Sequence, residues 1–522
     1  MLIALSQLNY TAGDIPGNCE KIITAVRKAR QAKADLIVFP ELAICGALPQ
    51  DFLEREEFID ACRLAIEKIA CECDHIAAVI GGPNLDITNG IMYNSAYFIQ
   101  HGEVVDGEHK NILSDYDIFN ESRYFVAGED NTPLQYKNQN IRIIFDEYEA
   151  EFIEKNDDLV LYIGMSPFTT ESARKRREVL AALAGKYRKN ILNVNHCGSY
   201  TSVLFDGLSM GFNEKGKQIY ALKEFEEDFI IIDTRRLGQT PPLSYVQPEK
   251  IELLHRALVF GIRDYFHKHH FSKAVLGLSG GIDSAVVAAL AAEALGPENV
   301  RGLLMPSIFS TDHSVSDAQK LAENIGMPYD IVPIKAIYEQ YLNALQPIFQ
   351  ETPFNVAEEN IQARIRGMLV MALSNKFGYI PLNTSNKSEA AVGYGTLYGD
   401  LCGSLGVIGD VYKSDIFRLA RNINREREII PEHTITKAPS AELRPGQKDQ
   451  DSLPDYAQLD AILKRYIEVN ESPENIIAEG YPQEIVHKIV NMVKRNEYKR
   501  AQCPPIIKVS TKAFGSGRKY PY

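Results

Sequence analysis

Four short apolar segments of β-forming residues alternate with helical stretches in the second half of the chain. They read AVLGLS, VRGLLMPS, YDIVPI and YIPLNTS, at residues 274–279, 300–307, 329–334 and 379–385. Each is a nearly continuous apolar run, as expected of a strand that is buried on both faces. Parallel neighbours in a sheet need a crossover helix between them, so this strict alternation favours parallel strands. We therefore predict a doubly wound parallel sheet, of the α/β class, for residues 251–522.

Residues 1–234 show a different pattern. Short β-rich runs are interleaved there with amphipathic helices, which we expect over residues 18–33, 54–73 and 172–187. Paired strands and long helices in this order predict a layered α/β sandwich. Between the two halves, residues 235–250 contain three prolines and little periodicity, which is typical of a linker.

The composition excludes several classes of protein. A net charge of −13 argues against a nucleic-acid binder, which usually carries a basic face. The eight cysteines are scattered, and the pair Cys71 and Cys73 has the wrong spacing for a zinc site. Unpatterned cysteines favour reduced thiols and a cytoplasmic location. The sequence shows neither a signal-peptide pattern nor a run of about 18 apolar residues, so we expect no membrane span.

A polar loop, Ser-Gly-Gly-Ile-Asp-Ser, follows the first of the four apolar segments and precedes an alanine-rich helix. Glycines let the backbone approach a ligand closely, and the N–H groups at a helix start attract anions. The lysine of the common nucleotide-binding pattern G-x-x-x-x-G-K-[ST] is missing here. Asp283 would repel a phosphate unless a divalent cation lay between them, so the loop predicts phosphate and Mg²⁺ binding. The alternative is a structural turn in which Asp283 and Ser284 cap the helix.

This loop resembles the pyrophosphate loop of ATP pyrophosphatases. Three further blocks lie at residues 383–400, 439–456 and 496–515. Together with the loop, they give residues 250–515 a resemblance to NAD⁺ synthetase. The resemblance implies a doubly wound domain of the adenine nucleotide alpha hydrolase type, with ATP and Mg²⁺ as cofactors and deamido-NAD⁺ as substrate. The implied ATP contacts are Ser279, Gly280, Gly281, Ile282, Asp283, Ser284, Thr384, Lys413 and Ser440; the implied metal carboxylates are Asp283 and Glu389; and the implied deamido-NAD⁺ contacts are Arg364, Glu389 and Lys499.

The reaction that this resemblance implies is an amidation. ATP adenylylates the nicotinate carboxylate, which turns its oxygen into a good leaving group, and ammonia then displaces AMP to give NAD⁺. Several of the implied residues have a structural alternative: Arg364 as a solvated helix residue, Glu389 as a helix cap and Lys499 as a surface charge. Rival functions are another ATP pyrophosphatase, such as GMP synthetase, and a pseudoenzyme that binds nucleotides or a partner protein.

Residues 1–235 resemble the nitrilase-like amidase domain of glutamine-dependent NAD⁺ synthetases, which implies an αββα sandwich. In FPELAICG, Glu41 stands where that family has its general base. In HKNILSDYDIFNESRYFVAG, Lys110 stands where it has its catalytic lysine. At the position of the nucleophilic cysteine this chain has Phe145, whose phenyl ring cannot attack a carbonyl.

The family pattern also changes at residues 46–49 and 197–202. We therefore predict an inactive amidase, with Glu41 and Lys110 left as a buried ion pair and ammonia as the direct nitrogen source. The alternative is a glutamine-dependent enzyme with a rearranged site, in which Cys197 is a conceivable nucleophile. The resemblance further implies a homodimer or a larger homo-oligomer.

Overall fold

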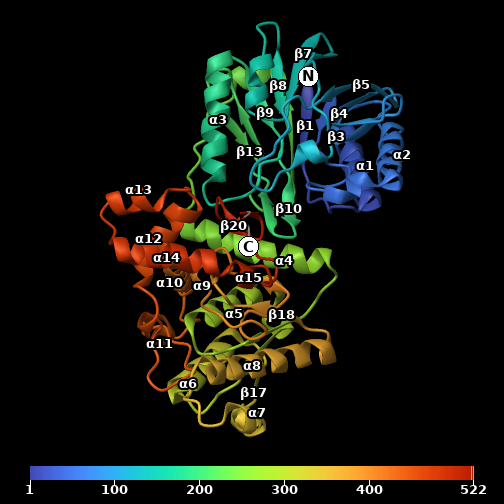
Figure 1. The fold of residues 1–522 in the computed structure, drawn as a ribbon. Helices are drawn as coiled ribbons and strands as arrows, with labels where there is room; N and C mark the ends of the chain where they lie inside the picture. Colours follow the sequence, from blue (N-terminus) through green and yellow to red (C-terminus); the bar gives the residue numbers. More distant parts are fainter. Residues whose placement is uncertain (519, 521–522) are drawn as a thin grey trace. The chain divides into compact units, whose positions relative to one another are not determined.

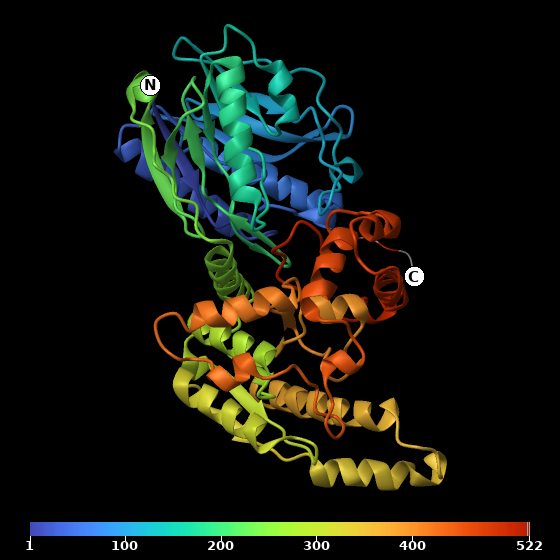
Figure 2. The ribbon, with the colours of Figure 1, turned by 90° about the vertical axis from the view of Figure 1, so that its left-hand side faces the viewer.

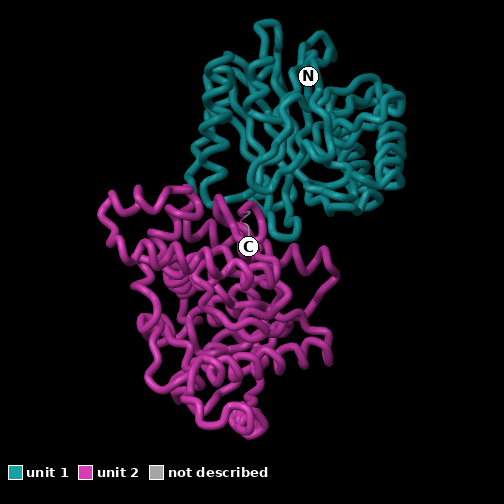
Figure 3. The backbone as a smooth tube through the Cα atoms, in the orientation of Figure 1, with its two compact units in different colours: residues 1–247 teal, residues 248–522 magenta. Residues whose placement is uncertain are grey.

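The computed structural model describes residues 1–518 and 520 of the chain. It divides into two compact units, residues 1–247 and 248–522 (Figure 3). The division lies within the segment where we expected a linker, and residues 241–249 have no regular secondary structure. Among the described residues, no helix combines the length and the apolar character that crossing a membrane requires.

Two six-stranded sheets form the centre of the first unit. In one of them β1 pairs in parallel with β2 and antiparallel with β14, in a register that joins Leu2 to Asp233. The order of this sheet is β14 (Asp228–Asp233), β1 (Leu2–Gln7), β2 (Leu36–Val38), β3 (Ala77–Asp86), β4 (Ile91–Gln100), β5 (Glu103–His109). The order of the other is β13 (Gln218–Ala221), β12 (Met210–Phe212), β9 (Asn190–Asn193), β8 (Leu159–Tyr162), β7 (Gln139–Ile144), β6 (Leu134–Tyr136), and a separate hairpin joins β10 (Cys197–Tyr200) to β11 (Val203–Asp206).

The two sheets lie between two layers of helices. Helices α1 (Ile15–Gln31) and α2 (Glu56–Ala70) cover the first sheet, and α3 (Ser172–Tyr187) covers the second (Figure 1). In Figure 2 the α3 layer faces the viewer, with the sheets and then α1 and α2 behind it. Along β7, Ile141 and Ile143 point into the cluster between the sheets, whereas Ile144 packs in the cluster under α3. The predicted αββα sandwich is therefore confirmed.

The second unit contains a five-stranded sheet whose neighbouring strands are all parallel. Its order is β17 (Tyr329–Ile331), β16 (Val300–Leu304), β15 (Ala274–Gly277), β18 (Ile380–Asn383), β19 (Leu405–Gly406). The chain thus builds outward from β15 in one direction and then returns to β15 to build in the other. This is the predicted doubly wound sheet, and it places a topological switch point between β15 and β18.

Helices surround this sheet and continue beyond it. Helices α7 and α8 pack with Val275 and Leu303 on one face, while α4, α5 and α10 contact one another. A further apolar cluster joins α9, α12, α13 and α14. The helices of the unit are α4 (Lys250–Lys268), α5 (Ile282–Leu295), α6 (Asp312–Ile325), α7 (Lys335–Phe349), α8 (Val356–Phe377), α9 (Lys387–Val392), α10 (Lys413–Ile423), α11 (Glu432–Thr436), α12 (Tyr456–Ile467), α13 (Pro473–Ala478), α14 (Gln483–Arg495) and α15 (Glu497–Arg500).

Candidate active site

The loop between β15 and α5 is ordered by its own hydroxyl groups. The Ser279 N–H donates to Ser284 Oγ at 3.3 Å, and the Gly281 N–H donates to Ser279 Oγ at 3.2 Å. Gly280 has a φ of +75°, and a Cβ there would lie 2.3 Å from the Ser314 carbonyl oxygen, so this position requires glycine. Gly281 is the N-cap of α5, with no side-chain cap. The helix start therefore offers N–H groups to an anion, while the Asp283 side chain contacts Lys413 and Asn386 and the Ser284 hydroxyl donates to the Gly281 carbonyl.

A cavity opens at the carboxyl ends of β15 and β18, where ligands bind in doubly wound sheets. It brings together all the residues that we expected to contact ATP or a metal ion. These lining residues are 279–284, Thr384, Glu389, Lys413 and Ser440. The structure therefore unites segments that lie more than a hundred residues apart in the sequence.

Asp283, Glu389 and Lys413 form a charged cluster inside this cavity. Lys413 Nζ lies 2.5 Å from Asp283 Oδ2 and 3.2 Å from Glu389 Oε1. Burial alone would lower the pKa of Lys413, but the two carboxylates outweigh it and raise that pKa above its usual range. Burial, helped by the nearby Asp283, raises the pKa of Glu389 despite the lysine. The cluster thus holds more negative charge than one lysine stabilises, and it would gain from a further cation.

The donor set fits Mg²⁺ that is shared with phosphate oxygens. Within residues 1–518 and 520, no group of three or more Asp, Glu, His or Cys side chains is arranged to hold a metal ion by itself. Mg²⁺ is usually bound by one or two carboxylates together with substrate phosphates and water. Asp283 and Glu389 provide that number of carboxylates beside the phosphate loop.

Two of the predicted substrate contacts lie outside the lining of this cavity. Arg364 Nε donates to the Leu397 carbonyl at 3.2 Å, and Lys499 Nζ donates to two backbone carbonyls, each at 2.8 Å. Their roles toward deamido-NAD⁺ stay predictions. Arg366, two residues further along α8 than Arg364, does line the cavity and donates to the Met305 carbonyl. Burial lowers the pKa of Arg366 to about 10.

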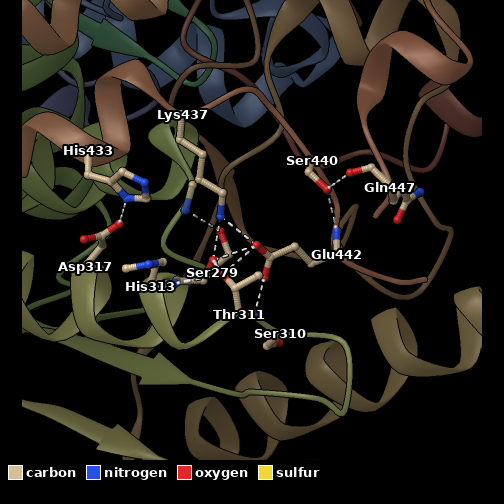
Figure 4. A network of polar contacts seen from close by, with 12 residues as sticks. Ser279, Ser310, Thr311, His313, Asp317, His433, Lys437, Ser440, Glu442 and Gln447 are labelled. Atoms are coloured by element: carbon tan, nitrogen blue, oxygen red, sulfur yellow. Dashed lines mark hydrogen bonds and ion pairs between the residues drawn. The ribbon is translucent and has the colours of Figure 1, made fainter. Parts of the chain in front are cut away.

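A polar network that the sequence did not indicate closes one side of the cavity (Figure 4). Lys437 Nζ lies 2.6 Å from both Ser314 Oγ and Glu442 Oε1, and the Thr311 N–H donates to Glu442 Oε2 at 3.3 Å. Burial would raise the pKa of Glu442, but hydrogen bonds from Lys437 and Ser314 lower it below its usual value. Ser440 Oγ accepts from the Glu442 N–H at 3.2 Å. Donors from Lys437, Ser314 and Thr311 thus converge on the Glu442 carboxylate, which lines the same cavity as the phosphate loop.

The first unit has its own buried charged cluster, at the predicted amidase position. Lys110 Nζ lies 2.8 Å from Glu41 Oε1 and 2.8 Å from Glu121 Oε2. Glu41 also accepts from Asn94 Nδ2 at 2.6 Å and from the Met165 N–H at 2.8 Å. Burial would lower the pKa of Lys110, but the two carboxylates raise it above its usual range. Glu41 is 0% exposed and Lys110 is 2% exposed, so each is satisfied within the protein.

Phe145 directly follows β7 and is only 2% exposed. Its side chain belongs to the apolar cluster between the two sheets. Its N–H donates to Glu149 Oε2 at 2.8 Å, and the other oxygen of Glu149 accepts from the Asn111 N–H at 2.6 Å. Glu149 therefore ties the backbone at Phe145 to the residue that follows Lys110. Phe145, which we expect at the family's nucleophile position, is therefore a buried aromatic residue of the core.

The two segments in which we expect departures from the amidase pattern, residues 46–49 and 197–202, contribute to one apolar cluster. Ala47 from the first and Tyr200 from the second belong to one apolar cluster with Val203 and Phe205. Cys197, the conceivable substitute nucleophile, is 1% exposed and begins β10. Residues from both segments thus form one packed, apolar unit.

Comparison with known proteins decides between the functional classes. Residues 2–241 match the family model for carbon-nitrogen hydrolase, and residues 254–503 match that for NAD synthase. A glutamine-dependent NAD(+) synthetase from Synechocystis is 42% identical over 99% of this chain and 98% of its own length. The chain belongs to the glutamine-dependent NAD(+) synthetase family. A second member, from Thermotoga maritima, is 38% identical over the same shares of both chains.

Solved structures of this synthetase family share the fold. The glutamine-dependent NAD⁺ synthetase of Acinetobacter baumannii, solved with adenosine diphosphate, matches with a TM-score of 0.81 at 36% identity, over 100% of this chain and 98% of that one. The structure from Cytophaga hutchinsonii matches with a TM-score of 0.86 at 23% identity, over 100% and 97%, and shows the fold alone. Membership of the NAD(+) synthetase family supports the predicted ligase activity and disfavours GMP synthetase.

Proposed function

We propose that this chain makes NAD⁺ from deamido-NAD⁺ and ATP through an adenylylated intermediate, and that free ammonia is its direct nitrogen donor. The cavity at the switch point supports the first part, because it joins an anion-binding loop to paired carboxylates and a buried lysine. Phe145 at the nucleophile position carries the second part.

The residues of the cavity have separable roles in the proposed reaction. The loop N–H groups and the start of α5 would bind the β- and γ-phosphates. Asp283 and Glu389 would hold Mg²⁺, which when bound neutralises charge on the phosphate oxygens. Lys413 would stabilise the charge that grows as the nicotinate oxygen attacks the α-phosphorus and the bond to pyrophosphate breaks. Thr384 and Ser440 would orient ATP from the two sides of the cavity.

The second half-reaction needs no covalent enzyme group. The ammonia nitrogen attacks the acyl carbon of the adenylate, the bond to AMP breaks, and one proton is released to solvent. Ammonia is mostly protonated at neutral pH, so the rate with ammonium salts should rise as the pH increases. Asp283, Glu389 and Lys413 would keep the adenylate in place during this step.

The front unit has lost what glutamine hydrolysis requires. In that reaction a thiolate attacks the amide carbonyl, Glu41 takes the proton and Lys110 stabilises the developing charge. Phe145 cannot supply the electron pair, and the packed cluster with Ala47 and Tyr200 fills space beside the former site. We infer that the unit persists as a structural scaffold.

Nitrogen-donor assays on the purified full chain test this proposal. We expect NAD⁺ formation with ammonium chloride and essentially none with glutamine freed of ammonia. Glu41→Gln provides a matched control, because it would abolish glutamine use in an active amidase but should leave the ammonium-dependent rate unchanged here. Release of glutamate and NAD⁺ in a one-to-one ratio, with glutamine as sole donor, would show that the amidase is active and the proposal wrong.

The alternative of a rearranged amidase has one observation in its favour, since the relatives are named glutamine-dependent. It would require a new nucleophile, and Cys197 at 1% exposure is poorly placed to meet glutamine. If glutamine does support NAD⁺ formation, loss of that activity in Cys197→Ser would identify the substitute.

A further inference from the structure

Asn386 is the residue immediately before α9, and it contacts both carboxylates of the cavity cluster. It is 0% exposed. Its side-chain Nδ2 donates to Asp283 Oδ1 at 2.8 Å, and its side-chain Oδ1 accepts from the Glu389 N–H at 3.0 Å. Its own backbone N–H donates to Glu389 Oε2 at 3.4 Å. Asn386 thus contacts both side chains that the proposed function assigns to the metal, Asp283 through its side-chain amide and Glu389 through its backbone N–H.

The contact with Asp283, and not the capping of α9, explains why this residue is an asparagine. Asn, Asp and Ser are about equally good N-caps, because each offers a side-chain oxygen to the first turn. Only the amide offers an acceptor to the helix and, on the same planar group, an N–H donor to a neighbour. An aspartate in place of Asn386 would cap α9 equally well but would set a further carboxylate against Asp283.

The two oxygens of Asp283 are consequently held by different partners. Oδ2 is bound by Lys413 and Oδ1 by Asn386. With both oxygens fixed, the carboxylate plane cannot rotate freely, and its remaining lone pairs point in set directions. Fixing a ligand's orientation through its second hydrogen bond is how outer partners commonly tune a metal site.

Helix α9, which Asn386 caps, is held in place by the contacts of its first two residues, Lys387 and Ser388. Lys387, the next residue, is fully buried and lies 2.9 Å from both Asp410 and Glu468. The hydroxyl of Ser388 accepts from the backbone N–H of Lys413 at 2.9 Å. The start of this short helix therefore positions the Asp283 side chain through the Asn386 amide. It positions the Lys413 backbone through the Ser388 hydroxyl.

We propose that Asn386 is a positioning residue that aims the Asp283 carboxylate at the cation shared with the ATP phosphates. The proposal rests on the function proposed above, in which Asp283 and Glu389 hold that cation. Asn386 is not among the residues that line the cavity, so in this proposal it acts through Asp283.

The test compares Asn386→Ser and Asn386→Asp with the wild type in the full chain. Both variants keep the capping acceptor, while the first shortens the donor out of reach and the second replaces it with a negative oxygen. Asn355 supplies the matched control, because it caps α8 with the same capping-box arrangement and is exposed to solvent. Asn355→Ser and Asn355→Asp change a cap in the same unit without touching Asp283.

Binding of Mn²⁺, measured by electron paramagnetic resonance with ATP present and deamido-NAD⁺ absent, reports on the site without turnover. We expect the dissociation constant for Mn²⁺ to rise about 10- to 100-fold in both Asn386 variants and to stay unchanged in both Asn355 variants. Thermal melting should shift equally little in Asn386→Ser and Asn355→Ser, because both keep a capping group, whereas Asn386→Asp should melt at a lower temperature because it buries a carboxylate beside Asp283.

Unchanged Mn²⁺ affinity in Asn386→Ser and Asn386→Asp would overturn the proposal, as would a melting temperature of Asn386→Ser far below that of Asn355→Ser. In the second case the residue would be a structural cap whose loss merely loosens α9. Failure of the proposed function looks different, since the wild-type chain itself would then show no ATP-dependent Mn²⁺ binding.

Discussion

Replacing Lys110 with methionine should destabilise the first unit while leaving ammonium-dependent NAD⁺ synthesis intact. Lys110 lies between the buried Glu41 and Glu121, each at 2.8 Å. Methionine has a similar length but no charge, so the two carboxylates would face each other without a cation. Because we assign the lysine no chemical role in this chain, the cost should appear in stability and not in turnover at temperatures where the unit stays folded.

The expected size follows from burial. Removing one partner of a buried ion pair costs about 3–5 kcal/mol. For a unit of this size each kcal/mol lowers the melting temperature by about 2–4 °C, which gives a fall of about 6–20 °C. The matched control is Lys137→Met, because the contact of Lys137 with Asp35 is half exposed and should be worth at most about 1 kcal/mol.

The loss of stability in Lys110→Met should also depend on pH. Burial and the nearby Glu41 already raise the pKa of Glu121, and loss of Lys110 would raise it further. A carboxyl group whose pKa in the folded state exceeds its unfolded value, about 4.3, favours folding when protonated, and this contribution is lost as the pH rises through the folded-state pKa. The difference between Lys110→Met and the wild type should therefore shrink as the pH falls.

Urea unfolding of the full chain, followed by hydrogen–deuterium exchange in peptides from residues 77–109, measures the first unit separately. Exchange in these strands should begin at clearly lower urea in Lys110→Met than in Lys137→Met. Equal shifts in the two variants would refute the assignment of a buried network centred on Lys110. Loss of the ammonium-dependent rate in a folded Lys110→Met chain would show that the lysine has a function we have not assigned.

Three further outcomes are expected. Asp283→Asn should abolish NAD⁺ formation without lowering the melting temperature, and near-wild-type turnover at ordinary Mg²⁺ would contradict the assignment of the loop. Phosphorus NMR should show ATP converted to AMP and pyrophosphate in step with NAD⁺ and only when deamido-NAD⁺ is present; stoichiometric ADP would reject adenylylation. Phe145→Cys alone should release no glutamate from glutamine, because Ala47 and Tyr200 still pack beside the site, and measurable glutamate release would show that the pocket persists.

The sequence predicted those parts of the fold whose signal is local. The strand, loop and helix around Gly280 were readable because apolar runs, glycines and helix periodicity all lie within one short stretch. Strand β19 was not, since Leu405–Gly406 is too short to show any pattern. The apolar run at 202–212 reads as one strand, yet it forms β11 and β12 in different sheets because the chain turns at Gly207, whose φ is +66°.

The site was predictable to the extent that its residues belong to recognisable blocks. Thr384, Glu389 and Lys413 line the cavity as expected. Lys437 and Glu442 contact the start of α6, which is far from them in the sequence. No local sequence pattern predicts contacts of this kind. In the same way, the replacement at Phe145 could be read directly, whereas the packing of the two altered segments against each other needed the structure.

Because β1 pairs with β14, the first unit cannot be completed during synthesis until its last strand has left the ribosome. Until residues 228–233 have emerged, the outer edge of β1 has no partner, although β2 can already pair with its other side. An open strand edge can recruit a strand from another chain, so the nascent protein is exposed to misassembly throughout this interval. A translational pause before residue 228 would prolong that exposure. A pause after residues 228–249 have emerged from the ribosome would instead let the first unit close before the second begins to fold.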